Sequence, residues 1–190
     1  MKKITFTLLL ILISIVSKAQ NLSMSELLSL LGKDVSYVEE FLTEKGWEFT
    51  EYVDKDNELS SVTFDFLRGK TVAGEQGAAS YITCYFNKEY QKINSIDIFF
   101  LHRPKYLEYI NSIKTYGYKV IKSIYDKNFI GKLYAKGGKV VLASTMTENS
   151  SDEYGEVMQR TTWHLIVSYA ESYQKRVEFT QKKYLQTEDN

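Results

Sequence analysis

Histidine and cysteine, the usual zinc ligands and two common catalytic residue types, are scarce in this 190-residue chain. There are two histidines, His102 and His164, and one cysteine, Cys84. A zinc site usually needs three or four histidine and cysteine ligands, which would use nearly all of them. We therefore predict no metal site and no cofactor. Cys84 alternates with Ile82 and Phe86 in a strand-like run, which predicts a buried thiol rather than a reactive one.

Two sets of polar residues could in principle support hydrolysis. Ser95, His164 and Asp97 could form a triad, but the chain has no G-x-S-x-G turn to expose a nucleophilic serine. Asp65 and Asp97 could hydrolyse a glycoside if both lay in one cleft, roughly 5–10 Å apart. We predict no catalytic residues, and a periplasmic hydrolase using these strand carboxylates is the alternative.

Tyrosine is abundant, with 15 copies. By strand alternation, Tyr81 and Tyr85 lie opposite Cys84, and Tyr134 lies opposite Leu133. If helices cover the apolar side of a sheet, these rings line its open side. Tyrosine gives a large contact area at a small entropic cost, which suits recognition, although it also simply favours strands. We predict that Tyr81, Tyr85 and Tyr134 bind a partner protein or a glycan.

The elements that would position these residues follow from periodicity and from helix-stop signals. Two helices are predicted at residues 25–31 and 34–45, with strands at 47–53, 61–67, 81–86 and 93–101. A third helix opens at Pro104, and strands follow at 118–125, 129–135, 139–145 and 161–169. Gly137-Gly138 predicts a two-residue hairpin. Longer loops are expected at 69–80 and 148–160.

This order of elements occurs twice. The predicted helix exits at Gly46 and Gly117 are 117 − 46 = 71 residues apart, and the last strands, centred on Ile96 and Leu165, are 165 − 96 = 69 apart. We predict an α+β fold made of a duplicated helix-plus-four-strand antiparallel unit, with helices on one face of a long curved sheet. The predicted segments are a signal peptide (1–19), two units (20–101 and 102–169) and a polar helix or tail (170–190).

Over residues 25–169, this arrangement resembles the beta-lactamase inhibitory protein architecture. The resemblance is one of topology: two tandem helix-and-four-strand units form one long curved sheet. It implies a sheet that grips a partner protein with aromatic residues.

The first 19 residues have the pattern of a secretory signal peptide. Lys2 and Lys3 precede an apolar run at 8–16, and Ser17-Lys18-Ala19 supplies the small residues of a cleavage site. We predict cleavage after Ala19 and a periplasmic or extracellular protein without an integral membrane anchor. The mature chain would keep 21 of the 24 basic residues beside 24 acidic ones, which argues against nucleic acid as a partner.

The sequence therefore predicts a secreted or periplasmic, non-catalytic binding module that contacts an unidentified protein through an open, tyrosine-bearing sheet face. Two alternatives are the hydrolase described above and a structural envelope protein with no specific ligand.

Overall fold

The computed structural model describes residues 22–54, 59–66, 80–151 and 157–175. The predicted signal peptide and its cleavage site after Ala19 lie outside the described residues, as do nearly all of the predicted loop at 69–80 and residues 176–190 of the predicted tail. In the described part of the chain, no helix is both long and apolar enough to cross a bilayer.

The described elements alternate helices with runs of strands. In chain order they are α2 (Met24–Leu30), α3 (Val35–Glu44), β1 (Trp47–Val53), β2 (Ser60–Phe66), β3 (Ser80–Phe86), β4 (Ile93–Phe100), α4 (Arg103–Thr115), β5 (Lys119–Asp126), β6 (Phe129–Lys136), β7 (Lys139–Ser151) and β8 (Val157–Tyr169). Residues 170–175 are also helical.

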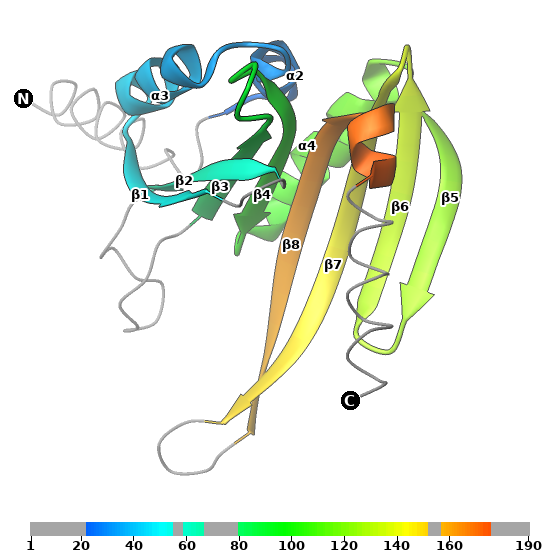
Figure 1. Ribbon diagram of the computed structural model, residues 1–190. Helices are drawn as coiled ribbons and strands as arrows, with labels where there is room; N and C mark the ends of the chain where they lie inside the picture. Colours follow the sequence, from blue (N-terminus) through cyan, green and yellow to red (C-terminus); the bar gives the residue numbers. More distant parts are fainter. Residues whose placement is uncertain (1–21, 55–58, 67–79, 152–156, 176–190) are drawn as a thin grey trace, which may run out of the picture.

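The eight strands form one antiparallel sheet in the order β1-β2-β3-β4-β8-β7-β6-β5 (Figure 1). Each run of four strands is a meander, and the two runs meet where β4 pairs with β8. β1 and β5 are the edges. The predicted α+β class with an antiparallel sheet is confirmed.

Local sequence explains how several elements begin and end. Ser23 and Glu26 form a capping box at the start of α2. Pro104 lies in the first turn of α4, where its missing N–H is tolerated. The hairpin between β6 and β7 has φ of 56° at Gly137 and 74° at Gly138, as its glycine pair predicts.

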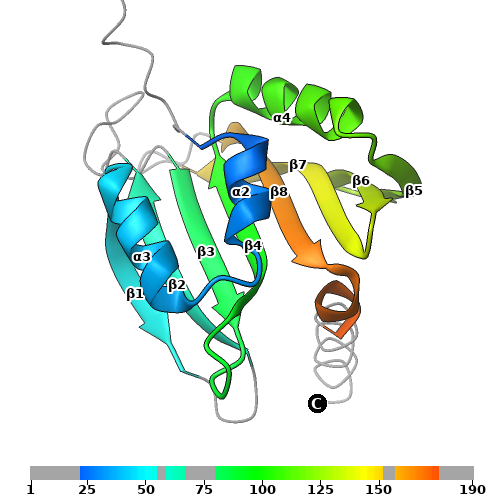
Figure 2. The same ribbon diagram turned by 90° about the horizontal axis from the view of Figure 1, so that it is seen from above.

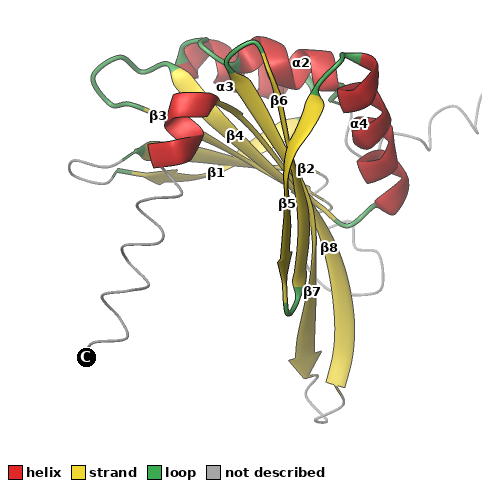
Figure 3. Ribbon diagram, turned by 90° about the vertical axis from the view of Figure 1, so that its right-hand side faces the viewer, coloured by secondary structure: helices red, strands yellow, loops and turns green. Residues whose placement is uncertain are grey.

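One face of the sheet shares its core with the helices, and we call it the helix face. Val38 and Leu42 from α3 and Tyr109 and Ile113 from α4 join Leu27 of α2 in one buried cluster with the sheet. The sheet contributes, among others, Phe64, Cys84, Ile96, Ile98, Val141, Leu165 and Val167. Figure 2 shows α2 and α3 over the first four strands, and Figure 3 shows α2, α3 and α4 bordering the bent sheet. Cys84 is fully buried here, as predicted.

The opposite side, which we call the second face, is partly covered at one end. Leu133, Val140 and Leu142 form a small buried cluster there, against which Tyr173 of the last described helix packs. Burial of this apolar patch explains why the helix docks on the sheet. The second face of β6 to β8 is therefore not fully open, contrary to expectation.

The predicted loop at 148–160 is largely strand. β7 continues to Ser151 and β8 starts at Val157, with Glu148 paired to Arg160 and Ser151 to Val157. In Figure 1 these two strands extend together past their neighbours. Continuing the ladder satisfies backbone N–H and C=O groups even where the sequence shows no apolar alternation.

Candidate binding surfaces

The three predicted binding tyrosines do not lie on one surface. Tyr81 and Tyr85 point to the second face and are half-buried. Tyr134 is only 3% exposed and lies on the helix face, opposite Val141 in the register. The prediction that Tyr134 shares an open face with Tyr81 and Tyr85 is therefore wrong.

The error has a physical cause in the middle of β6, where the adjacent residues Leu133 and Tyr134 are both buried although they point to opposite faces. Leu133 lies in the small cluster of the second face, while Tyr134 lies in the main core near Tyr106 of α4. Burial, with Tyr106 nearby, raises the pKa of Tyr134 above its usual value. Alternation showed that the two residues point to opposite sides, but it could not show which side the helices cover.

Tyr81 belongs to a row of rings that crosses three adjacent strands on the second face. Its ring centroid lies 5.0 Å from that of Phe99 on β4, and Phe99 lies 4.9 Å from His164 on β8 in an edge-to-face contact. We call Tyr81, Phe99 and His164 the aromatic row. His164 Nε2 also lies 3.2 Å from the hydroxyl of the buried Thr162. All three rings are half-buried.

Sequence reasoning did not identify Phe99 as a site residue. Its signal was present, because Ile96, Ile98 and Phe100 alternate towards the core and therefore direct Phe99 to the other side. Pairing of β4 with β8, which brings His164 beside it, is a tertiary feature.

The residues considered for hydrolysis are dispersed along the second face. Ser95 lies opposite Ser168 and His164 opposite Phe99, so four residues along the strand, about 13 Å, separate the two. This is too far for a serine–histidine hydrogen bond. Asp65 and Asp97 lie on β2 and β4 with β3 between them, which places their Cα atoms about 12 Å apart.

Metal ligands are not clustered either. Within the described ranges, no group of three or more His, Cys, Asp and Glu side chains could hold a metal ion.

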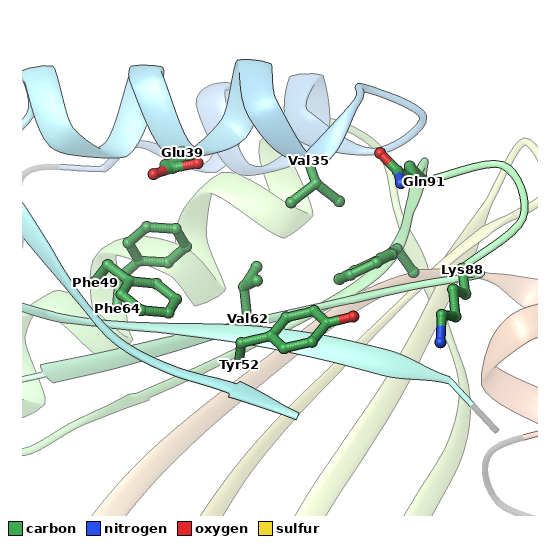
Figure 4. A pocket seen from close by; sticks show the side chains of 9 residues that line it. Val35, Glu39, Phe49, Tyr52, Val62, Phe64, Lys88 and Gln91 are labelled. Carbon is green, nitrogen blue, oxygen red and sulfur yellow. The ribbon is translucent and has the colours of Figure 1, made fainter. Parts of the chain in front are cut away.

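A second candidate site is a pocket on the helix face, between α3 and the edge of the sheet (Figure 4). Its volume is about 390 Å³, within the range of small-ligand sites. Its lining is mainly apolar with a few polar groups: Val35, Glu39, Phe49, Tyr52, Val62, Phe64, Phe86, Lys88 and Gln91. Two of the aromatic side chains are strongly exposed, Phe49 by 53% and Tyr52 by 48%.

An irregularity in β1 builds the outer wall of this pocket. Phe49 pairs with Phe64 and Tyr52 with Val62, because the register shifts at Thr50. In a regular strand, residues three apart would point to opposite faces. The shift turns both rings to the helix face, and Thr50 donates a hydrogen bond to the Thr63 carbonyl at 3.2 Å. Simple alternation therefore could not predict the pocket.

Comparison with known proteins gives no information about the function of either surface. No family model, curated protein or solved structure matches this chain. The second face offers a row of contacting rings, and the helix face offers a small apolar pocket.

Proposed function

We propose that this protein is an exported, non-catalytic binding module that recognises a partner protein through the aromatic row and Tyr85 on the second face. The observation that carries this proposal is the contact of Tyr81, Phe99 and His164 across three strands, at centroid distances of 5.0 and 4.9 Å. The rings are already packed against one another. A partner can therefore bury them at a small cost in side-chain entropy.

The surroundings of the row also suit protein recognition. Asp65, Thr83 and Asp97 are half-buried on the same face, beside the rings in the register. Interfaces commonly place aromatic anchors within a polar surround that excludes water. Hydrolysis would need the carboxyl groups of Asp65 and Asp97 to lie about 5–10 Å apart in one cleft, and their Cα atoms are about 12 Å apart across β3.

Duplication of a helix-plus-four-strand unit is part of the proposal. The strand register shifts at Thr50 in β1 and at Ile121 in β5, and 121 − 50 = 71. That separation equals the distance between Gly46 and Gly117, whose φ angles of 83° and 76° end α3 and α4 in the same way. Matching glycines and matching bulges support two copies of one unit.

Export follows from the signal-peptide pattern at residues 1–19. The fully buried Cys84 fits an oxidising compartment, because its thiol is shielded from forming disulfides between molecules. Mass spectrometry of the exported protein should show a chain beginning at Gln20. An uncleaved or lipid-modified chain would contradict this part of the proposal.

Site-specific photo-crosslinking in the producing cell tests the binding face. A photoreactive phenylalanine derivative would replace Tyr85 in one variant, and Tyr37 on α3 or Tyr90 in the turn between β3 and β4 in two controls, whose side chains are 48% and 65% exposed. We expect discrete protein adducts from position 85 only. Adducts of equal yield at all three positions, or none at 85, would contradict the proposal, and a glycan adduct would redirect it to sugars.

Alanine substitutions then measure the contribution of the rings. With a partner identified by crosslinking, Tyr81→Ala and Tyr85→Ala should each weaken binding about tenfold, as expected for hot-spot aromatics. Tyr90→Ala is the matched control and should leave affinity unchanged. The melting temperature should change little in all three variants. A large loss of stability without loss of affinity would assign Tyr81 and Tyr85 to packing.

The pocket under α3 favours a second candidate function, binding of a small apolar molecule. Its six apolar lining residues and its volume of about 390 Å³ suit a ligand with an aromatic or short aliphatic body. Titration with the fluorescent probe 1-anilinonaphthalene-8-sulfonate would test it. Phe49→Ala should lower the probe affinity several-fold, whereas Leu107→Ala, an exposed apolar control on α4, should not.

A further inference from the structure

The edge strand β5 exposes apolar side chains to an unusual degree. Val120, Ile121 and Tyr125 are exposed by 52%, 60% and 73%, and Ile130 on the adjoining β6 by 57%. Val120 lies opposite Tyr134 and Tyr125 lies opposite Ile130, so Val120, Tyr125 and Ile130 share the helix face. An edge strand also presents unpaired backbone N–H and C=O groups. This end of the sheet therefore combines apolar surface with backbone groups that can pair.

The sequence of β5 is complementary to itself when two copies run antiparallel. With Ser123 opposite Ser123 of the other copy, Lys122 lies opposite Ile124. Because the register shift makes Ile121 an extra residue, the next pair outward is Val120 with Tyr125. The last pair is Lys119 with Asp126.

The side-chain directions agree with this register. Residues directly opposite in antiparallel strands must point to the same face. Val120 and Tyr125 both point to the helix face, whereas Lys119 and Asp126 pair with Ala135 and Phe129 and point to the second face. Without the bulge, residues 120 and 125 would face opposite sides and this pairing would fail.

We propose that a second copy of this chain pairs with β5 in a two-fold-symmetric antiparallel arrangement centred on Ser123, which continues the sheet across a homodimer. Each dimer would contain two Lys119–Asp126 charge pairs on the second face. On the helix face, Val120, Tyr125 and Ile130 of both copies would form one apolar cluster. A two-fold interface of this kind is closed, so assembly stops at two chains.

The other edge of the sheet lacks this self-complementarity. β1 carries Glu48 and Glu51, both exposed and both on the second face, and no basic residue. Two β1 strands side by side would bring like charges together, which is unfavourable. Pairing β1 of one copy with β5 of another would instead produce an open series of oligomers.

Disulfide trapping tests the proposed axis. In the proposed register the two Ser123 Cα atoms lie about 4.5–5.5 Å apart, within disulfide reach, while the native Cys84 is buried. The mature protein with Ser123→Cys should form a covalent dimer under mild oxidation. Asn128→Cys, in the exposed turn after β5, is the control and should form several-fold less. Equal yields from both positions, or a monomer from both, would overturn the proposal.

Charge exchange tests the register without removing any apolar contact. Sedimentation equilibrium of the mature protein should show a monomer–dimer equilibrium, weakened about tenfold by Lys119→Asp or Asp126→Lys. The double variant Lys119→Asp/Asp126→Lys should restore most of the dimer, and Lys114→Asp on α4 should have no effect. A monomer at all concentrations, failure of the double variant to recover, or an open series abolished by Glu48→Lys would refute the symmetric dimer.

Discussion

Glu26 connects the two N-terminal helices through a single carboxylate. It accepts hydrogen bonds from the Ser23 backbone N–H at 2.7 Å and from Lys45 Nζ at 2.6 Å. Partial burial acts to raise the pKa of Glu26, but the hydrogen bonds from Lys45 and Ser23 outweigh it and lower the pKa to about 2. The ionised form therefore contributes to stability above the usual carboxyl pKa, and this contribution is lost as the pH falls towards about 2.

We expect Glu26→Gln to lower the free energy of unfolding by about 1 kcal/mol at neutral pH, since the pair is partly solvent-screened. Urea unfolding at a series of pH values would measure the difference from the wild type, which should shrink from about pH 4.5 downwards. Glu44→Gln, at an exposed position in α3, should have little effect. A difference that stays constant down to about pH 2 would show that the carboxylate charge is not responsible.

The Cys84 thiol should be unreactive in the folded protein. Its side chain is fully buried, and burial raises the pKa of the thiol to about 12, so almost no thiolate is present at neutral pH. A bulky disulfide reagent should react with it only after denaturant is added. Asn128→Cys supplies an exposed thiol as control and should react at once. Rapid labelling of native Cys84 would indicate that β3 opens readily.

At the scale of elements, the ends of α3 and α4 depend on glycines that accept a left-handed conformation. At Gly46, φ is 83° and nothing lies within 4 Å of an added Cβ, so any penalty of substitution there arises from the backbone alone. Gly46→Ala should therefore lower the free energy of unfolding by about 1 kcal/mol. Gly46→Asn should lower it less, because asparagine tolerates this conformation. Thermal unfolding of the two variants would compare them, and equal losses would contradict the backbone explanation.

At the scale of the whole molecule, the pairing of β4 with β8 joins the two four-strand meanders into one sheet. Ile98 on β4 lies opposite Leu165 on β8, and both are fully buried in the core that the helices share. We expect the chain to unfold in one transition. Trp163→Phe leaves Trp47 in the first half as the reporter, and Trp47→Phe leaves Trp163 in the second. Within each variant, the fluorescence midpoint should coincide with that of circular dichroism.

Leu165→Ala should lower the free energy of unfolding by about 2–5 kcal/mol, as for other cavities in a packed core. Ile166→Ala, at the next residue but half-buried on the second face, should have a smaller effect. If Leu165→Ala separates the unfolding of the two halves, the pairing of β4 with β8 and the core beneath it are the source of cooperativity. A loss in the free energy of unfolding no larger than that caused by Ile166→Ala would contradict the importance of the core at the β4–β8 pairing.

The sequence determined the features that depend on neighbouring residues along the chain. Alternation located all eight strands within a few residues, except where β7 and β8 run on into the predicted loop, and it predicted the burial of Cys84. The glycine pair at 137–138 determined its hairpin, because positive φ at both positions is a local requirement.

Only the tertiary structure decided which side of each strand the helices cover. Tyr134 is buried on the helix face because α4 lies above it, while Leu133 is buried on the other side because Tyr173 covers it. The pocket likewise depends on one extra residue at Thr50, which places Phe49 and Tyr52 side by side, and the aromatic row depends on β8 lying beside β4. A period of two fixes relative direction within a strand, but the packing of distant segments fixes what each direction meets.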